Sequence, residues 1–350
     1  MGYFIIFIWF IIFCLLSNRT YTKKQINTAL LCWASLVVFI FMFKDNTKVP
    51  DVETYMNLFS IYARYSIKDA FACLTDNEDI GYSVLNILCS RVSNNYYFFQ
   101  FVYSLIITFS CTLFIKRYST NIILSGYIAI CSMFFLLFLM RFALAFSICL
   151  FALDYAIKRK PIHFAVCILL AVLFHKSAII FSIVYFLTYL KFNFKYIILF
   201  CAISLFAGLS VESIISQAIV IADSSHFEAY IESDSMISWK VLVIPLLSLL
   251  IILIGYRNKF HELTKAQELF IYMNLLAIVF NVIHVMGTSF SAFYRLVPYF
   301  SFVNVIIIPD ALKFIESSLL RKGLTIVTMG LFLYTLIATA ESQRGFGFII

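Results

Sequence analysis

Residues 122–153 read IILSGYIAICSMFFLLFLMRFALAFSICLFAL, and Arg141 is the single charged side chain in the stretch. One straight helix needs only about 20 apolar residues to cross a hydrocarbon core of ~30 Å. The stretch therefore predicts two membrane spans that meet in a tight turn, with Arg141 at or just below that turn. A guanidinium near the membrane is costly unless it reaches the interface or binds an anion, so Arg141 is a candidate functional residue.

The composition predicts an all-α, polytopic membrane protein. Of the 350 residues 63% are hydrophobic and only 13% are charged, too few charges to cover the surface of a soluble protein of this size. The net charge of +8 fits Lys and Arg that gather in cytoplasmic loops and face anionic lipid, and we do not take it as a sign of nucleic-acid binding. No glycine-rich phosphate loop precedes a helix and no Cys/His ligand spacing occurs, so we expect no nucleotide, cofactor or metal.

Apolar stretches predict about twelve transmembrane helices in a single transmembrane domain over residues 1–350. The predicted spans are 3–17, 26–43, 97–115, 120–138, 141–157, 162–175, 177–191, 195–210, 239–256, 267–286, 293–312 and 324–340. The first stretch has no basic residues before it and no small-residue cleavage site, so we interpret it as a retained helix whose N-terminus is external, not a signal peptide.

The basic residues predict the orientation. With the N-terminus outside, the inner connections hold 16 of the 26 Lys and Arg, and each inner connection has at least two. These residues are Arg19, Lys23, Lys24, Lys116, Arg117, Lys158, Arg159, Lys160, Lys191, Lys195, Arg257, Lys259, Lys265, Lys313, Arg321 and Lys322. Both termini and the two largest polar segments, about 44–96 and 211–238, then lie outside, together with Arg141, His175 and Arg295.

The outer segment 44–96 is too apolar for a disordered tail. Residues 56–65 have amphipathic helical spacing, and a second such helix begins at Gly81 after an acidic cluster, so both helices fit the interface plane. Cys73 and Cys89 lie in this polar region and can pair in an oxidising compartment. No internal repeat and no matched pair of broken helices, which many transporters have, is found.

Two arginines on short outer turns suit a diphosphate, because a guanidinium binds phosphate oxygens in pairs and keeps its charge in apolar surroundings. Arg141 and Arg295, with His175 on a third outer turn, favour a shared anion site over the alternative that each arginine anchors a helix end at the head groups. His175 can exchange protons near neutral pH, although a structural role fits equally well. Lys176 alone fits a side chain that reaches up to the interface.

The outer carboxylates Asp51, Glu53, Glu78 and Asp79 can orient a sugar hydroxyl or accept its proton. Each one, taken singly, also fits a solvated loop charge. Asp51 follows a proline and precedes a predicted helix, so it fits a helix cap as well.

These motifs together resemble the EpsG family of polysaccharide-biosynthesis membrane proteins, which is related in role to Wzy-type O-antigen and capsule polymerases. The resemblance runs in order from Asp51 to Tyr299. It rests on Asp51-x-x-x-Tyr55, Glu78-Asp79-Ile80-Gly81-Tyr82, Asn94-Asn95-Tyr96-Tyr97-Phe98-Phe99, Arg141-Phe142-Ala143-Leu144-Ala145, Phe174-His175-Lys176-Ser177-Ala178, and Tyr294-Arg295 followed by Pro298-Tyr299.

The resemblance implies a polymerase of the glycosyltransferase type in the bacterial cytoplasmic (inner) membrane, acting on oligosaccharide repeat units carried by undecaprenyl diphosphate. Arg141 and Arg295 would stabilise the leaving diphosphate, and His175 would assist there or compete with Asp51 or Glu78 as the base. The implied substrate-binding residues are Glu53, Tyr55, Glu78, Asp79, Tyr82, Lys176 and Tyr294. A chain-length regulator and a flippase of the same pathway are the implied partners.

The alternative is a flippase for the same lipid-linked oligosaccharide. A flippase would place charges along a central path at mid-membrane, whereas the predicted orientation gathers them on one face, which favours the polymerase. A membrane O-acyltransferase would need a His-centred site reached from inside, where the connections offer mainly basic residues. A structural partner of an export complex is the remaining possibility.

Overall fold

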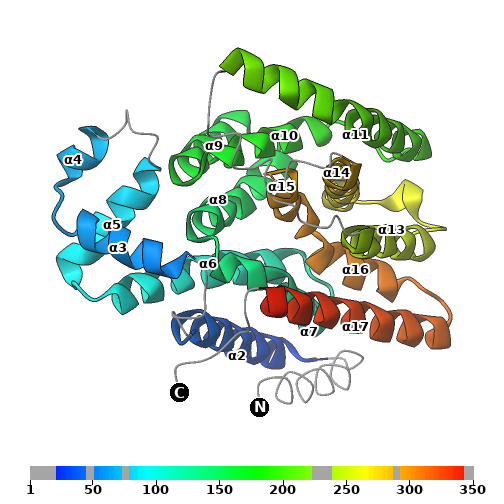
Figure 1. The fold of residues 1–350 in the computed structure, drawn as a ribbon. Helices are drawn as coiled ribbons and strands as arrows, with labels where there is room; N and C mark the ends of the chain where they lie inside the picture. Colours follow the sequence, from blue (N-terminus) through cyan, green and yellow to red (C-terminus); the bar gives the residue numbers. More distant parts are fainter. Residues whose placement is uncertain (1–20, 45–50, 73–78, 223–238, 287–291, 343–350) are drawn as a thin grey trace. The chain divides into compact units, whose positions relative to one another are not determined.

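The computed structural model describes residues 21–44, 51–72, 79–222, 239–286 and 292–342. Within these ranges all regular structure is helical, which confirms the predicted all-α class (Figure 1). The first predicted span, 3–17, lies outside the described residues, as does most of the outer segment 211–238.

The chain divides into two compact units, residues 1–185 with 325–350, and residues 186–324. The first unit contains α2 (Lys23–Met42), α3 (Val52–Tyr62), α4 (Ile67–Ala72), α5 (Ile80–Val92), α6 (Tyr96–Tyr118), α7 (Ile122–Met133), the 3-10 helix η2 (Phe134–Leu137), α8 (Met140–Ile157), α9 (Pro161–Phe174), η3 (Lys176–Ser182) and most of α17 (Ser318–Ser342). The second contains α11 (Phe194–Ala222), η4 (Trp239–Leu242), α13 (Val243–Gly255), η5 (Phe260–Glu262), α14 (Lys265–Met286), α15 (Ala292–Ser301) and α16 (Asn304–Lys313). The short α10 (Ile183–Leu187) lies at the boundary in sequence.

Five of these helices are long and apolar enough to cross a membrane: α2, α6, α8, α14 and α17. The bent pair α15–α16, with 46° between its halves, makes a sixth if it counts as one span. Apolar helices also stand at the other described positions where spans were predicted, but they have only 10–17 residues. At 1.5 Å per residue the 14 residues of α9 cover about 21 Å, less than a hydrocarbon core. The predicted count of about twelve is therefore not confirmed.

The long apolar run around Arg141 does form two helices, as predicted. The α7 helix tightens into η2 over Phe134–Leu137, and the backbone leaves helical geometry at Leu139, where φ is −110° and ψ is 68°. The α8 helix then begins at Met140. Arg141 is thus the second residue of α8, directly after the break.

The basic ends of α6 and α8 lie together, in agreement with the predicted alternation of spans. Asp154 near the end of α8 pairs with Arg117 of α6 at 2.9 Å and with Lys158 at 2.7 Å. At the opposite ends of the same helices, the Tyr96 hydroxyl lies 3.4 Å from the Met140 sulfur. The two helices are therefore antiparallel, and the end that carries Arg141 is the one without the basic cluster. Which side of the membrane this end faces stays a prediction.

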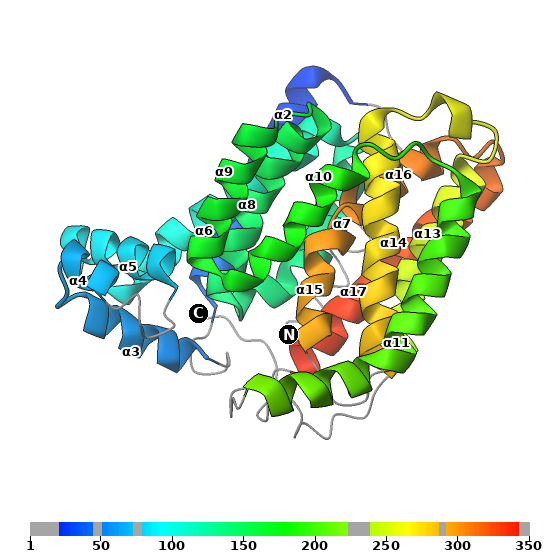
Figure 2. The ribbon, with the colours of Figure 1, turned by 90° about the horizontal axis from the view of Figure 1, so that it is seen from above.

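Helices α3, α4 and α5 group at the Arg141 end of α6, α8 and α9 (Figure 2). The α3 helix is amphipathic, as predicted, because Val52, Tyr55, Phe59 and Tyr62 are buried at helical spacing. Its rings join an aromatic cluster: Tyr55 lies 5.8 Å from Tyr82, and Phe59 lies 5.9 Å from Tyr96 between ring centroids. This cluster packs α3 and α5 against each other and against the start of α6.

Glycine 81 lets α5 approach the C-terminal end of α9. A Cβ atom at this position would lie 3.0 Å from the Leu173 carbonyl oxygen and 3.0 Å from the Phe174 ring. Since real Cβ contacts are almost never closer, a larger residue would push the helices apart. The close approach brings the residue before α5, Asp79, beside the residue after α9, His175.

In the second unit, α14 is the most buried long helix, with 78% of its apolar window covered. At its Lys265 end the buried carboxylate of Asp310 accepts hydrogen bonds from the Tyr256 hydroxyl at 2.6 Å and from the Gln267 amide. Beside them the backbones of α13 and α16 pack closely together, since a Cβ at Gly255 would lie 2.2 Å from the Ala311 carbonyl oxygen. A buried polar network and a glycine contact thus join α13, α14 and α16 at one end of the unit.

Candidate functional site

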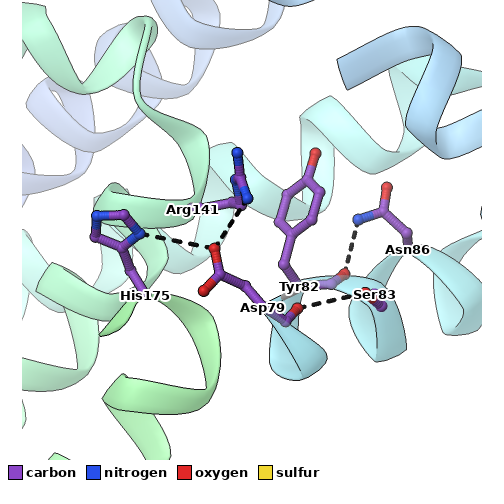
Figure 3. Close-up of polar contacts among 6 residues, drawn as sticks. All are labelled: Asp79, Tyr82, Ser83, Asn86, Arg141 and His175. Carbon is purple, nitrogen blue, oxygen red and sulfur yellow. Dashed lines mark hydrogen bonds and ion pairs between the residues drawn. The ribbon is translucent and has the colours of Figure 1, made fainter. Parts of the chain in front are cut away.

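Asp79, Arg141 and His175 lie together in the first unit, where the start of α5 meets the start of α8 and the end of α9 (Figure 3). Asp79 Oδ2 lies 3.1 Å from Arg141 Nη1 and 3.7 Å from His175 Nδ1. The Asp79 side chain is 7% exposed, whereas the Arg141 and His175 side chains are 41% and 34% exposed. The carboxylate is therefore enclosed, and the two nitrogen-bearing groups also face outward.

All three residues stand at helix ends. Asp79 precedes α5, where its carbonyl oxygen accepts the backbone N–H groups of Tyr82 and Ser83 at 2.9 and 3.1 Å. Its side chain makes no capping bond and is left to reach Arg141 and His175. His175 ends α9 in an extended conformation before η3 begins. The starts of α5 and α8 and the end of α9 thus place the three side chains.

The electrostatic arrangement is one carboxylate against a guanidinium and an imidazole. The Asp79–Arg141 contact occupies one of the five N–H donors that a guanidinium offers. His175 Nδ1 has no hydrogen-bond partner among the described residues, because 3.7 Å exceeds hydrogen-bonding distance. Its ring packs against Phe142 in a T-shaped arrangement, with 6.0 Å between the centroids. The group can accept an anion on its exposed side and a proton on the imidazole.

Tyrosines 55 and 82 line the inner side of this group. Burial raises the pKa of Tyr55, while the charge of Arg141 and a hydrogen bond to it act in the opposite direction. Tyr82 is 1% exposed, and its hydroxyl has no hydrogen-bond partner within the described ranges. Both predicted residues therefore lie next to Arg141, although they are too enclosed to be a sugar-binding surface in this conformation.

The remaining predicted residues of the first unit are more dispersed. Asp51 and Glu53 are exposed, and Asp51 has a positive φ of 63°. Asp51 precedes α3 without a side-chain capping bond, so the capping alternative is wrong for its side chain. Lys176 is exposed beside His175. Glu78 and Cys73 lie outside the described residues, so the role of Glu78 and the Cys73–Cys89 pair stay predictions.

Arg295 and Tyr294 belong to α15 in the second unit. Arg295 is exposed, and the Tyr294 ring lies 5.3 Å from the His284 ring between centroids. Arg141 belongs to the first unit and Arg295 to the second, so the shared site expected for the two arginines stays a prediction. Asp79, which the motif suggests as a substrate-binding residue, faces Arg141 as its counter-ion, and its part in substrate binding stays a prediction.

The burial of Lys44 was not predicted, because its place in the sequence indicated the first charge of an outer loop. It is completely buried, and its Nζ donates to the Leu137 carbonyl oxygen at 2.6 Å. The sequence of α6 does indicate a polar face, because Tyr96, Gln100 and Tyr103 recur at helical spacing. Such a face inside an apolar bundle needs partners at the same depth, and the end of α2 supplies one.

The comparison with known families agrees with the motifs. The family model described as EpsG family matches residues 30–349. The chain belongs to the EpsG family. The EpsG family comprises membrane proteins of the Wzy-like polysaccharide polymerase type, so the family predicted from the short motifs between Asp51 and Tyr299 is confirmed. No curated protein and no solved structure matches the chain.

Proposed function

We propose that this EpsG-family protein polymerises oligosaccharide repeat units carried on undecaprenyl diphosphate, at the external face of the cytoplasmic membrane. The observation that carries the proposal is the group of Asp79, Arg141 and His175 at helix ends of a membrane protein. This group combines an exposed guanidinium with a titratable imidazole, which suits a diphosphate-bearing lipid that enters from the bilayer. The product is an O-antigen, capsule or exopolysaccharide chain.

The reaction transfers a growing chain from its carrier to a single repeat unit. A hydroxyl oxygen of the acceptor sugar attacks the anomeric carbon of the donor, and the bond from that carbon to the diphosphate oxygen breaks. Undecaprenyl diphosphate leaves with the bonding electrons, and the hydroxyl proton passes to a base. The diphosphate linkage of the donor supplies the driving force, so the reaction needs no nucleotide.

Arg141 supplies the electrostatic part of this mechanism. Negative charge develops on the departing diphosphate, and a guanidinium held in place before the reaction stabilises it without reorganising. The ion pair with Asp79 fixes the guanidinium while four of its N–H donors stay outside that contact. Arg295 is proposed as the second cation for the same diphosphate.

The base is proposed among His175, Asp51 and Glu78. His175 has the geometry that supports this role best, since its imidazole is one-third exposed and stands beside Arg141's counter-ion. Histidine is also the side chain that most often transfers protons in catalysis. Glu53, Tyr55, Tyr82, Lys176 and Tyr294 are proposed substrate contacts, with Tyr55 and Tyr82 acting only after the group opens.

The second candidate function is a flippase for the same lipid-linked oligosaccharide. The bent pair α15–α16 supports it, because broken helices surround the substrate in many transporters. Asn304 at the start of α16 and Asn274 in α14 are also buried, with amide oxygens that lack hydrogen-bond partners among the described residues. These uncharged groups do not suit a diphosphate as well as the Arg141 group does.

The test replaces Arg141 and Arg295 by Ala, separately, in the native host, with Arg64→Ala as a control on the same predicted face. Surface polysaccharide is separated on a gel, and the membrane level of each variant is measured. Collapse of the ladder to one repeat unit at a normal protein level supports the polymerase. Loss of all surface sugar with lipid-linked units trapped inside supports the flippase, and an unchanged ladder refutes both roles for the arginines.

A further inference from the structure

Lys44 is a buried lysine at the point where α2 ends. Its side chain is fully enclosed, and Nζ lies 2.6 Å from the carbonyl oxygen of Leu137, the last residue of η2. Burial lowers the pKa of Lys44 from its ordinary value of 10.5 to about 7. A lysine in such surroundings costs stability, and a methionine of similar volume would fill the same space without that cost.

The break between η2 and α8 explains why a donor is needed there. The last carbonyl groups of a helix have no partner in the helix, and in an apolar interior water does not replace one. Two consecutive carbonyls at the end of η2 receive side-chain donors instead: Leu136 from the Tyr103 hydroxyl, and Leu137 from Lys44. Side chains from α6 and from the end of α2 thus donate the hydrogen bonds that the carbonyl groups at the break need.

Gln100 completes this arrangement from α6. Its amide nitrogen donates to the carbonyl oxygens of Phe41 and Met42 at 2.9 and 2.8 Å, at the end of α2. We call Lys44, Gln100 and Tyr103 the break clamp. It ties the end of α2 and the end of η2 to the same face of α6, one helical turn from the cluster around Tyr96.

The break clamp lies directly before the site arginine. Only Phe138 and Leu139 separate Leu137 from Met140, the first residue of α8, and Arg141 follows. The depth and rotation at which α8 begins therefore follow from where Leu137 is held. A shift of the helix start of about 1 Å would break the 3.1 Å contact between Arg141 and Asp79.

We infer that Lys44 is a positioning residue, which holds the start of α8 so that the Arg141 guanidinium faces its anionic ligand. The inference rests on the proposed function, since Arg141 is the group that Lys44 serves. Lys44 does not touch the substrate, being fully enclosed. Its effect on the reaction passes through Leu137 and the first turn of α8.

Lys44→Met tests the inference, with Lys68→Met as the matched control because Lys68 is exposed on α4. Purified variants are assayed with lipid-linked repeat units. Lys44→Met should lower kcat about tenfold and change KM less than threefold, since a misplaced guanidinium loses an interaction of the transition state. Lys44→Gln, which keeps a donor, should recover part of the loss. Equal kcat for Lys44→Met and the wild type would overturn the inference.

A double-mutant cycle separates positioning from a general loss of stability. If Lys44 acts through Arg141, adding Lys44→Met to Arg141→Lys lowers kcat by less than threefold further, whereas independent effects would multiply. Multiplication of the two losses would overturn the inference.

A third readout does not depend on polymerase activity. Cys32 and Cys201 are exposed and are first replaced by Ser. In this background a charged thiol reagent reacts with an Arg141→Cys variant in membranes at a rate that should depend on the position of the α8 start. Lys44→Met should change this rate at least threefold, while Lys68→Met should leave it unchanged. If Arg141→Ala leaves the ladder intact but the thiol rate still responds to Lys44, the proposed function fails and the positioning holds. An unchanged thiol rate refutes the positioning itself.

Discussion

Replacement of Asp79 by Asn distinguishes a counter-ion from a catalytic base. Asp79 contacts both Arg141 and His175 through the same oxygen, Oδ2, at 3.1 and 3.7 Å. Asn keeps the size of the side chain and an oxygen that accepts from Arg141, but it removes the charge and the ability to take a proton. The two roles therefore predict losses of very different size.

The geometry of the Asp79–Arg141 ion pair predicts the smaller of the two losses in rate. Two unit charges 3.1 Å apart attract by ~5 kcal/mol at an effective dielectric constant of about 20. Arg141 is 41% exposed, so water screens this attraction, and exposed pairs contribute about 1 kcal/mol or less. A value between these limits and nearer the lower one, about 1.4 kcal/mol, corresponds to a tenfold fall in rate. Loss of a general base would cost about 100- to 10,000-fold.

The assay measures the proposed reaction, as the initial rate of polymerisation of lipid-linked repeat units by purified protein at matched protein level. Asp69→Asn is the control, because Asp69 is an exposed carboxylate that caps the short α4 through Ser66. We expect Asp79→Asn to lower kcat about tenfold and Asp69→Asn to leave it unchanged. A loss beyond 100-fold at normal folding would refute the counter-ion assignment and make Asp79 the base.

Three further predictions follow from the packing. Gly255→Ala should lower the apparent Tm of the purified protein, because the new Cβ would lie 2.2 Å from the Ala311 carbonyl oxygen and overpacking costs about 1–3 kcal/mol. Gly323→Ala is the control and should not lower the Tm, because a Cβ there has no atom within 4 Å. Tyr82→Phe should keep or raise Tm, because the hydroxyl has no hydrogen-bond partner in the described structure; a clear fall in Tm would mean that the hydroxyl is bonded. Between pH 7 and 10.5 the unfolded chain binds more protons at Lys44 than the folded protein does, because burial lowers the folded pKa to about 7. The free energy of unfolding of the wild type, compared with that of Lys44→Met, should therefore rise with pH in this window, by about 1 kcal/mol from pH 7 to 8. The same difference in Tm between the two proteins at pH 7 and at pH 9 would contradict this prediction.

Helix boundaries near the site were predictable because the local sequence determines them. An apolar run too long for one span, with one arginine inside it, forced a break, and the structure has that break two residues before Arg141. The amphipathic α3 and the start of α5 after the acidic cluster were predictable for the same reason. Hydropathy could not give the number of spans, because it measures how apolar a segment is and not whether its helix is straight and long enough.

The pairing within the site was not predictable from the sequence. Asp79 lies 62 positions before Arg141, and four outer carboxylates were available with nothing in the sequence to rank them. What selects Asp79 is the close approach of α5 to the end of α9 at Gly81, a contact between backbones that leaves no pattern in hydropathy. Lys44 was missed for a related reason, since a lysine after an apolar run is typical of a membrane boundary, and its burial depends on Leu137.

The counter-ion also bears on turnover. In the proposed reaction the released undecaprenyl diphosphate keeps the negative charge that develops in the transition state. A guanidinium and an imidazole without a carboxylate would therefore hold this product tightly, and product release could then limit kcat. The negative charge of Asp79 repels the diphosphate more strongly after its bond to the sugar has broken, because the diphosphate has then gained charge, while the contact with Arg141 keeps the guanidinium oriented. Asp79→Asn should therefore make undecaprenyl diphosphate a stronger inhibitor even as it lowers kcat. A carboxylate enclosed between a guanidinium and an imidazole thus suits the proposed reaction, in which the site releases a diphosphate in every cycle.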